Sequence, residues 1–147
     1  MTVVRLGRVL GVDLGSRRVG LALSDPSRVI ASPHAVVARG VSHDDLIRVV
    51  TPVVREYEVT LVVVGLPLSL SGRDGPAARA ARAVVDAMQG RFGDEIPVVL
   101  HDERLTTITA QRSLREAGVR GRAHTSVVDK VAAAVMLQAY LDGSVPR

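Results

Sequence analysis

Acidic side chains stand at the ends of two apolar segments. Asp13 lies near the end of the run 8–14, and Asp102 and Glu103 follow the run 97–100 after one residue, His101. In open α/β sheets, ligands bind in the crevice beyond the carboxyl ends of the strands. Carboxylate oxygens are also the ligands that hard divalent cations such as Mg²⁺ prefer. These three residues therefore mark a candidate ligand site.

Each of these acids also has a structural interpretation. Asp13 is able to accept hydrogen bonds from the backbone of the turn at 15–17, because aspartate often initiates turns. Asp102 or Glu103 is able to pair with Arg104 or to cap a following helix. In an extended chain the side chains of these two neighbours point to opposite faces, so at most one of them is expected to join a given site.

A fourth acid, Asp129, lies near the start of the last predicted helix, 126–141. With Ser126 as the N-cap, Asp129 occupies the third helical position, which is the spacing of a capping box and suits the helix dipole. The preceding basic segment 119–125 contains Gly121, and we expect it to be a mobile loop that closes over substrate. A capping role and a ligand role both remain open for Asp129.

The elements that must position these acids follow from the apolar patterning. Ser42 and Asp45 have the spacing of a capping box at the start of a helix that contains Pro52. The remaining predicted strands are 8–14, 19–24, 29–38, 61–65 and 97–100. The remaining predicted helices are 76–89 and a helix that follows the segment HDERLTT and ends at Gly118. Three consecutive strands followed by alternating helices and strands predict a mixed α/β sheet covered by helices.

Length and composition narrow the class of protein. A chain of 147 residues is expected to form one domain with a substantial core. Cysteine is absent, which excludes disulfides and thiolate metal sites. No apolar run reaches the roughly 18 residues of a membrane span. We therefore expect a soluble cytoplasmic protein without a membrane partner.

The charge balance favours phosphate-bearing partners. The formal net charge is +4, and Lys130 is the one lysine among 19 basic residues. Basic proteins attract nucleic acids through counterion release. Two tyrosines, one phenylalanine and no tryptophan argue against the aromatic base-stacking platforms of many RNA-binding domains.

Four ordered segments carry a family resemblance that covers nearly the whole chain. They are VLGVDLGSRRVGLALSD, VVVGLPLSLSG, VVLHDERLTT and VVDKVAAAVML. They resemble the signature blocks of the YqgF/RuvX family, described as pre-16S rRNA nucleases and related to Holliday-junction resolvases of the RNase H-like superfamily. The first block also resembles the phosphate-binding hairpin of actin-like ATPases, but those proteins pair two such domains around the nucleotide.

The resemblance implies a fold and a set of site residues. The fold is a single RNase H-like domain over 1–147, a mixed five-stranded sheet with its first three strands antiparallel and the later strands parallel to the first. Asp13, Glu103 and Asp129 match the catalytic, metal-binding acids. The related resolvases carry a carboxylate at the end of the fourth strand, where this chain has Gly65, so Glu103 has to supply that second acid.

The resemblance also implies a chemistry. The cofactor is Mg²⁺ or Mn²⁺, and a pair of such ions activates water and stabilises charge during phosphodiester hydrolysis. Precursor rRNA is the favoured substrate; a branched DNA junction and a noncatalytic nucleic-acid-binding role are the alternatives, with ribosome-assembly or transcription factors as candidate protein partners. Basic residues near the four blocks are expected to contact phosphates: Arg17, Arg18, Arg73, Arg104, Arg120, Arg122 and Lys130.

Overall fold

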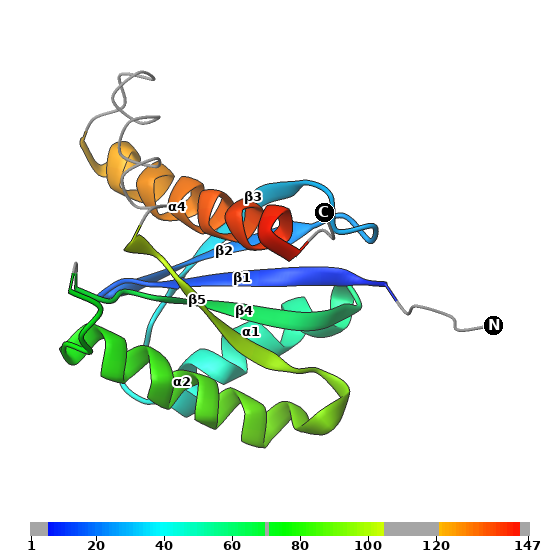
Figure 1. The fold of residues 1–147 in the computed structure, drawn as a ribbon, viewed down its shortest axis with the longest axis horizontal. Helices are drawn as coiled ribbons and strands as arrows, with labels where there is room; N and C mark the ends of the chain where they lie inside the picture. Colours follow the sequence, from blue (N-terminus) through cyan, green and yellow to red (C-terminus); the bar gives the residue numbers. More distant parts are fainter. Residues whose placement is uncertain (1–5, 70, 105–120, 145–147) are drawn as a thin grey trace.

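The computed structural model describes residues 6–69, 71–104 and 121–144, the last range by backbone alone over 121–128. A five-stranded sheet in the order β3-β2-β1-β4-β5 forms its centre (Figure 1). The antiparallel pairs are β1–β2 and β2–β3, and the parallel pairs are β1–β4 and β4–β5. The strands are β1 (Arg8–Leu14), β2 (Arg18–Ser24), β3 (Ala31–Ala38), β4 (Val59–Leu66) and β5 (Val98–Asp102). The predicted mixed sheet is confirmed.

Helices cover both faces of this sheet. On one face lie α1 (His43–Glu56) and α2 (Pro76–Phe92), followed by the short 3₁₀ helix η1 (Gly93–Glu95). The other face is covered by α4 (Gly121–Ser144), which crosses β1, β2 and β3 (Figure 1). Side chains alternate between the two faces along β1, so Val9 packs under α4 whereas Leu10 joins the cluster with α1 and α2. Two apolar layers therefore share one sheet.

The start of α1 is confirmed in detail. The Ser42 hydroxyl accepts a hydrogen bond from the Asp45 amide at 3.2 Å, and the Asp45 carboxylate accepts one from the Ser42 amide at 3.1 Å. This reciprocal pair satisfies amides that a helix start otherwise leaves without partners. The helix then continues through Pro52 to Glu56.

The last helix begins earlier than predicted. It starts at Gly121 rather than Ser126, so residues 121–125 are helical, and the expectation of a loop there is wrong. Good helix formers such as Arg122 and Ala123, with no proline to stop them, extend the helix backward. Asp129 consequently lies in the third turn, and its interpretation as a capping residue is wrong. Residues 119–120 and the predicted helix ending at Gly118 lie outside the described residues.

Within the described ranges, no helix combines the length and the apolar character needed to cross a membrane.

Candidate active site

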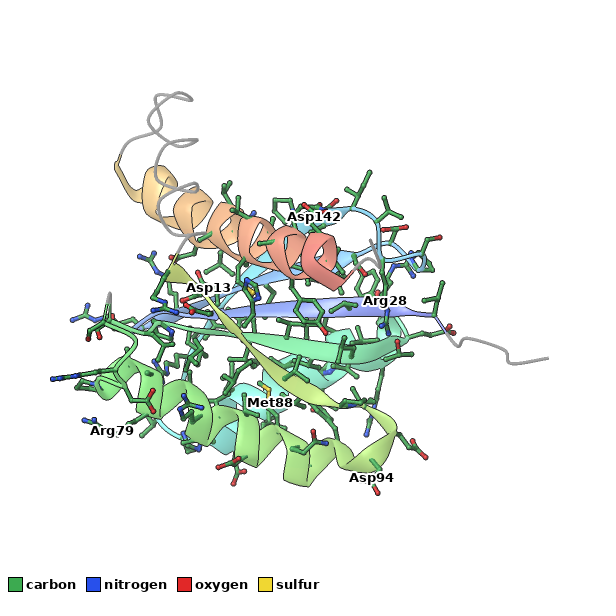
Figure 2. The ribbon with its side chains drawn as sticks, viewed as in Figure 1. Asp13, Arg28, Arg79, Met88, Asp94 and Asp142 are labelled. Carbon is green, nitrogen blue, oxygen red and sulfur yellow. The ribbon has the colours of Figure 1, made fainter. Side chains whose placement is uncertain are left out.

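The parallel strands place the predicted acids at one edge of the sheet. Asp13 is the second-last residue of β1, where it stands opposite Gly20 of β2. Val12 pairs with Val64 of β4, so the carboxyl end of β4 lies beside Asp13. Figure 2 shows Asp13 at this edge of the sheet. The edge is therefore the crevice in which α/β proteins bind ligands.

Glu103 brings its carboxylate to the end of β4. Its amide donates a hydrogen bond to the carbonyl oxygen of Leu66 at 3.1 Å, which continues the pairing of β5 with β4. A Cβ atom added to Gly65 would collide with Oε1 of Glu103. The Glu103 carboxylate thus fills the space of a side chain at the end of the fourth strand. This is the placement expected if Glu103 supplies the acid that related resolvases carry at the position of Gly65.

Asp13 and Glu103 form a hydrogen-bonded pair, here called the carboxylate pair. Burial, the hydrogen bond to Asp13 and the negative charge of Asp13 together raise the pKa of Glu103 to about 9. Glu103 therefore holds a proton at neutral pH when no cation is bound. Two carboxyl groups forced together in this way attract either a shared proton or a positive ion.

The Asp13 turn is closed by the backbone. The Gly15 amide donates to the carbonyl oxygen of Arg18 at 2.8 Å, and Arg39 donates to the carbonyl oxygen of Gly15 at 2.7 Å. A tight turn of this kind does not need a carboxylate to brace it. The Asp13 side chain is accordingly directed to Glu103.

Asp129 approaches Asp13 from α4. A Cβ atom on Gly20 would collide with the backbone carbonyl of Asp129 and would lie 3.3 Å from Cβ of Ala133. The missing side chain at Gly20 therefore lets α4 rest on the sheet directly opposite Asp13. Sequence reasoning did not single out Gly20, although a glycine inside an apolar strand often marks a close approach of another backbone.

Arg18 holds the Asp129 side chain. Its Nε lies 3.4 Å from Oδ2 of Asp129. Burial raises the pKa of Asp129, the Arg18 charge opposes this shift, and the Asp13 charge adds to it. Asp129 is thus close enough to Asp13 for the Asp13 charge to raise its pKa, although it is paired with Arg18.

The donor set suits a hard cation, although it is not closed. No three histidine or acidic side chains within the described ranges lie close enough to hold one ion together. The structure brings Asp13 and Glu103 into contact, whereas Asp129 lies near Asp13 but is paired with Arg18. Mg²⁺ typically takes one or two carboxylates and completes its octahedron with water and substrate phosphate, so the carboxylate pair fits such an ion.

Asp102 has a different role from Glu103. Its Oδ1 accepts a hydrogen bond from the Arg104 amide at 3.0 Å, and its Oδ2 accepts one from Nε of Arg104 at 2.8 Å. These bonds lower the pKa of Asp102. The structural interpretation is thus confirmed for Asp102. These bonds hold Arg104 at the end of β5, with Nη1 near Gly72 of the loop after β4.

The other residues predicted to contact phosphates differ in how exposed they are. Arg17 and Arg73 are exposed near the same edge, and Lys130 is half-buried beside Asp129. Arg122 lies in the first turn of α4, and its side chain, like all of Arg120, lies outside the described residues.

His101, near the end of β5, packs against α4. Its ring packs edge-on against Tyr140 of α4, with ring centroids 6.0 Å apart. Burial lowers the pKa of His101, and the Asp102 charge opposes this effect. A half-buried, mostly neutral imidazole packed in this way has a structural role in joining β5 to α4.

Comparison with known proteins shows which family this chain resembles. A family model described as "RuvX: Holliday junction resolvase" matches residues 7–143. Proteins carrying the name "Putative pre-16S rRNA nuclease" include one from Mycobacterium sp. (strain KMS), 49% identical over 92% of this chain and 80% of that protein. Another, from Roseiflexus sp. (strain RS-1), is 39% identical over 92% of this chain and 94% of that protein.

Solved structures share the fold at low identity. RuvC of T. thermophilus in complex with a Holliday junction substrate superimposes with a TM-score of 0.54 at 16% identity, covering 92% of this chain and 96% of RuvC. The yeast mitochondrial Holliday junction resolvase Ydc2 gives a TM-score of 0.50 at 11% identity, covering 97% of this chain and 83% of Ydc2. Together with the match over residues 7–143, these likenesses show that the chain belongs to the RuvX family and has the fold of the RuvC-type resolvases.

Proposed function

We propose that this chain is a nuclease that hydrolyses phosphodiester bonds with Mg²⁺ or Mn²⁺ bound at Asp13, Glu103 and Asp129. The observation that carries the proposal is the Glu103 carboxylate, seated over Gly65 and hydrogen-bonded to Asp13 at the carboxyl ends of β1 and β4. Placing two half-buried acids against each other costs stability, and a structural role gives no reason to accept that cost. A cation that replaces the shared proton would offset that cost by stabilising both carboxylates.

The chain's own residues prepare this site. Asp13 is fixed by the β1–β2 ladder and Glu103 by its backbone bond to Leu66, so both donors are oriented before any ligand arrives. Divalent ions, when bound, activate water and neutralise the charge that develops at phosphorus and at the leaving oxygen. Asp129 is able to join the pair when a substrate phosphate draws Arg18 away, because the two anions compete for one guanidinium.

Basic side chains around the crevice hold the substrate backbone. Arg104 is pre-oriented by Asp102, whereas Arg17 and Arg73 are exposed and adaptable. Contacts to phosphates position a nucleic acid without reading its sequence. The cleavage position is consequently selected by the shape of the substrate as much as by its bases.

The favoured substrate is precursor 16S rRNA, and the proposed setting is a single domain acting in the cytoplasm during ribosome maturation. The support comes from relatives up to 49% identical that carry the corresponding name. A four-way DNA junction is the second candidate, supported by the family description and by the likeness to RuvC.

One cleavage experiment tests the proposal. Purified protein is incubated with a precursor 16S rRNA fragment and with a four-way DNA junction, in Mg²⁺, in Mn²⁺ and in EDTA. We expect metal-dependent cleavage that favours the RNA and is lost in Asp13→Asn and Glu103→Gln. Preferential cleavage of the junction would replace the substrate. Salt-dependent binding of both substrates without cleavage in either metal would show a noncatalytic binding module.

A further inference from the structure

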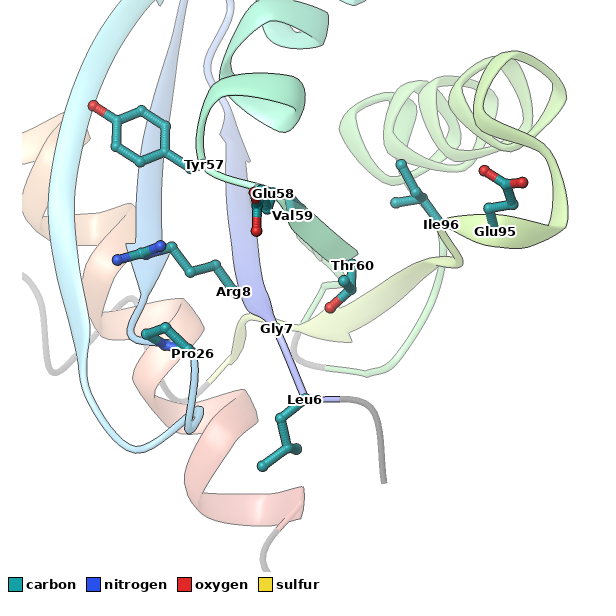
Figure 3. Close-up of a pocket in the computed structure, with 10 residues that line it drawn as sticks. All are labelled: Leu6, Gly7, Arg8, Pro26, Tyr57, Glu58, Val59, Thr60, Glu95 and Ile96. Atoms are coloured by element: carbon teal, nitrogen blue, oxygen red, sulfur yellow. The ribbon is translucent and has the colours of Figure 1, made fainter. Parts of the chain in front are cut away.

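Two hollows lie away from the carboxylate pair, and their charges differ. One, of about 710 Å³, opens at the amino ends of β1 and β4; its charged lining residues are Arg8, Glu58 and Glu95, which are together net acidic (Figure 3). The other, of about 560 Å³, lies between α1 and α2 and has three arginines and one aspartate. We call it the arginine groove, and its lining residues are Asp44, Ile47, Arg48, Thr51, Pro52, Arg55 and Arg91.

The arginines of the groove share one side of the helical layer. Arg48 and Arg55 are two turns apart on α1 and therefore lie on the same face, while Arg91 comes from the last turn of α2. All three are exposed. Such an arrangement presents guanidinium groups from two helices to one ligand.

These guanidinium groups form few ion pairs with the described part of the protein. Arg48 makes a long ion pair of 3.7 Å with Asp45, and its side chain is 76% exposed, so the pair contributes little. Neither Arg55 nor Arg91 takes part in an ion pair among the described residues. Arg82, which lies on α2 outside the groove, is by contrast bound to Asp74 at 2.7 Å. The groove thus retains its cationic donors for an external anion.

We propose that the arginine groove is a second nucleic-acid contact, which binds phosphodiester groups of a strand whose other part lies at the carboxylate pair. The inference rests on the proposed function for the identity of the ligand. Arginine matches phosphate geometry with paired N–H donors, and an excess of two positive charges over Asp44 favours a polyanion. The contact is independent of base sequence.

The position of the groove sets the length of nucleic acid that reaches it. Arg55 and Arg91 lie in the last turns of α1 and α2, and Asp94, just beyond α2, lies at the end of the molecule opposite Asp13 in Figure 2. Strand β4 has eight residues. At ~3.3 Å per residue it spans ~26 Å, which corresponds to ~8 stacked nucleotide steps of 3.4 Å and to fewer steps where the strand is extended. Substrates much shorter than this span therefore fill the crevice without reaching Arg55 and Arg91.

Binding in EDTA tests the proposal without any cleavage. Fluorescence anisotropy is measured with labelled single-stranded RNAs of about 30 and about 3 nucleotides, much longer and much shorter than the ~8 stacked steps of the span. We expect the triple variant Arg48→Gln/Arg55→Gln/Arg91→Gln to bind the long RNA more weakly and to lose about two units of log–log salt slope, at ~0.7 per phosphate contact. Binding of the short RNA stays at the wild-type level.

A charge-matched pair provides the control. Asp44→Asn and Asp86→Asn each raise the net charge by one, but Asp44 lines the groove, whereas Asp86 is exposed on α2 outside it. Only Asp44→Asn is expected to tighten binding of the long RNA. Equal effects of the two variants, or a triple variant with wild-type affinity and salt slope for the long RNA, would overturn the proposal. Thermal melts confirm that each variant is folded.

The outcome is separable from that of the proposed function. If the wild type binds the long RNA through the groove but cleaves nothing in Mg²⁺ or Mn²⁺, the nuclease assignment fails and the groove remains. If the wild type cleaves and the triple variant is unchanged in binding, the groove assignment fails alone.

Discussion

At the scale of single residues, the carboxylate pair combines an unfavourable charge arrangement with a favourable site for a cation. Glu103 is half-buried and hydrogen-bonded to Asp13, and both effects favour its protonated form. A bound cation reverses this preference, because it stabilises both carboxylates in their ionised form. Stability, proton uptake and metal binding are therefore coupled at two residues.

Neutral replacements of these residues separate a metal site from a structural one. Asp13→Asn and Glu103→Gln remove the unfavourable pairing of two acids, which Glu103 otherwise relieves by taking up a proton, and also remove an ion ligand. We expect both variants to melt in EDTA at or above the wild-type temperature, by about 2–4 °C for each kcal/mol relieved. Both should gain less than the wild type from Mg²⁺ or Mn²⁺ and lose cleavage. Thermal melts beside the cleavage assay measure this; variants destabilised equally with and without metal, yet active, would contradict a metal site.

The raised pKa of Glu103 predicts a pH dependence with a definite sign. Between its unfolded pKa and about 9, the folded protein binds a proton that the unfolded chain has released. The free energy of unfolding therefore falls as pH rises through this window. Burial of Asp129 acts in the same direction.

Melting temperatures measured in EDTA from pH 5 to about 9 check this sign. The wild type should lose stability across the range, and Glu103→Gln should show a flatter profile because it cannot release that proton. Saturating Mg²⁺ should remove most of the difference between the two proteins above neutral pH. A Glu103→Gln profile parallel to that of the wild type would show that Glu103 is ionised in the metal-free protein.

At the scale of elements, two glycines admit the groups that build the site. The space above Gly65 holds the end of the Glu103 side chain, whereas the space above Gly20 holds the backbone of α4 at Asp129. A flexible carboxylate is able to move from an added methyl group, but a helix backbone packed on a sheet is not. The same substitution therefore has different consequences at the two positions.

Alanine substitutions test this difference. Gly65→Ala should displace Glu103 from Asp13, so that cleavage falls strongly while stability changes little. Gly20→Ala should lower the free energy of unfolding by about 1–3 kcal/mol, because it overpacks the contact between β2 and α4. Gly90→Ala on α2 is the control, since nothing lies within 4 Å of its added Cβ. Chemical denaturation and the cleavage assay together measure the effects; equal stability losses at Gly65 and Gly20 would contradict this account.

The elements also show how far the sequence determines the structure. The strands and the start of α1 were predictable because apolar runs and the Ser42–Asp45 capping box are local signals. The start of α4 was not, because the spacing of Ser126 and Asp129 mimics a capping box, whereas the helix extends backward from it. The Arg18–Asp129 pair depends on the packing of α4 on β2, which no local pattern encodes.

At the scale of the whole molecule, one sheet supports two apolar layers. The layer under α1 and α2 and the layer under α4 both include residues of β1, β2 and β4. Loss of either layer exposes the other face of the same strands. The two layers should therefore unfold together, as a single domain does.

Two tyrosines report on the two layers separately. Tyr57 packs against the layer with α1 and α2, Tyr140 packs against the layer with α4, and the chain has no tryptophan to mask them. The variants Tyr140→Phe and Tyr57→Phe leave a single tyrosine in one layer or the other. We expect the fluorescence of each to follow the same urea transition as the helical circular dichroism, with equal calorimetric and van't Hoff enthalpies for the wild type. A Tyr140 signal lost at lower urea than the Tyr57 signal would mean that α4, which carries Asp129, detaches as a separate unit from a sheet that still holds the carboxylate pair.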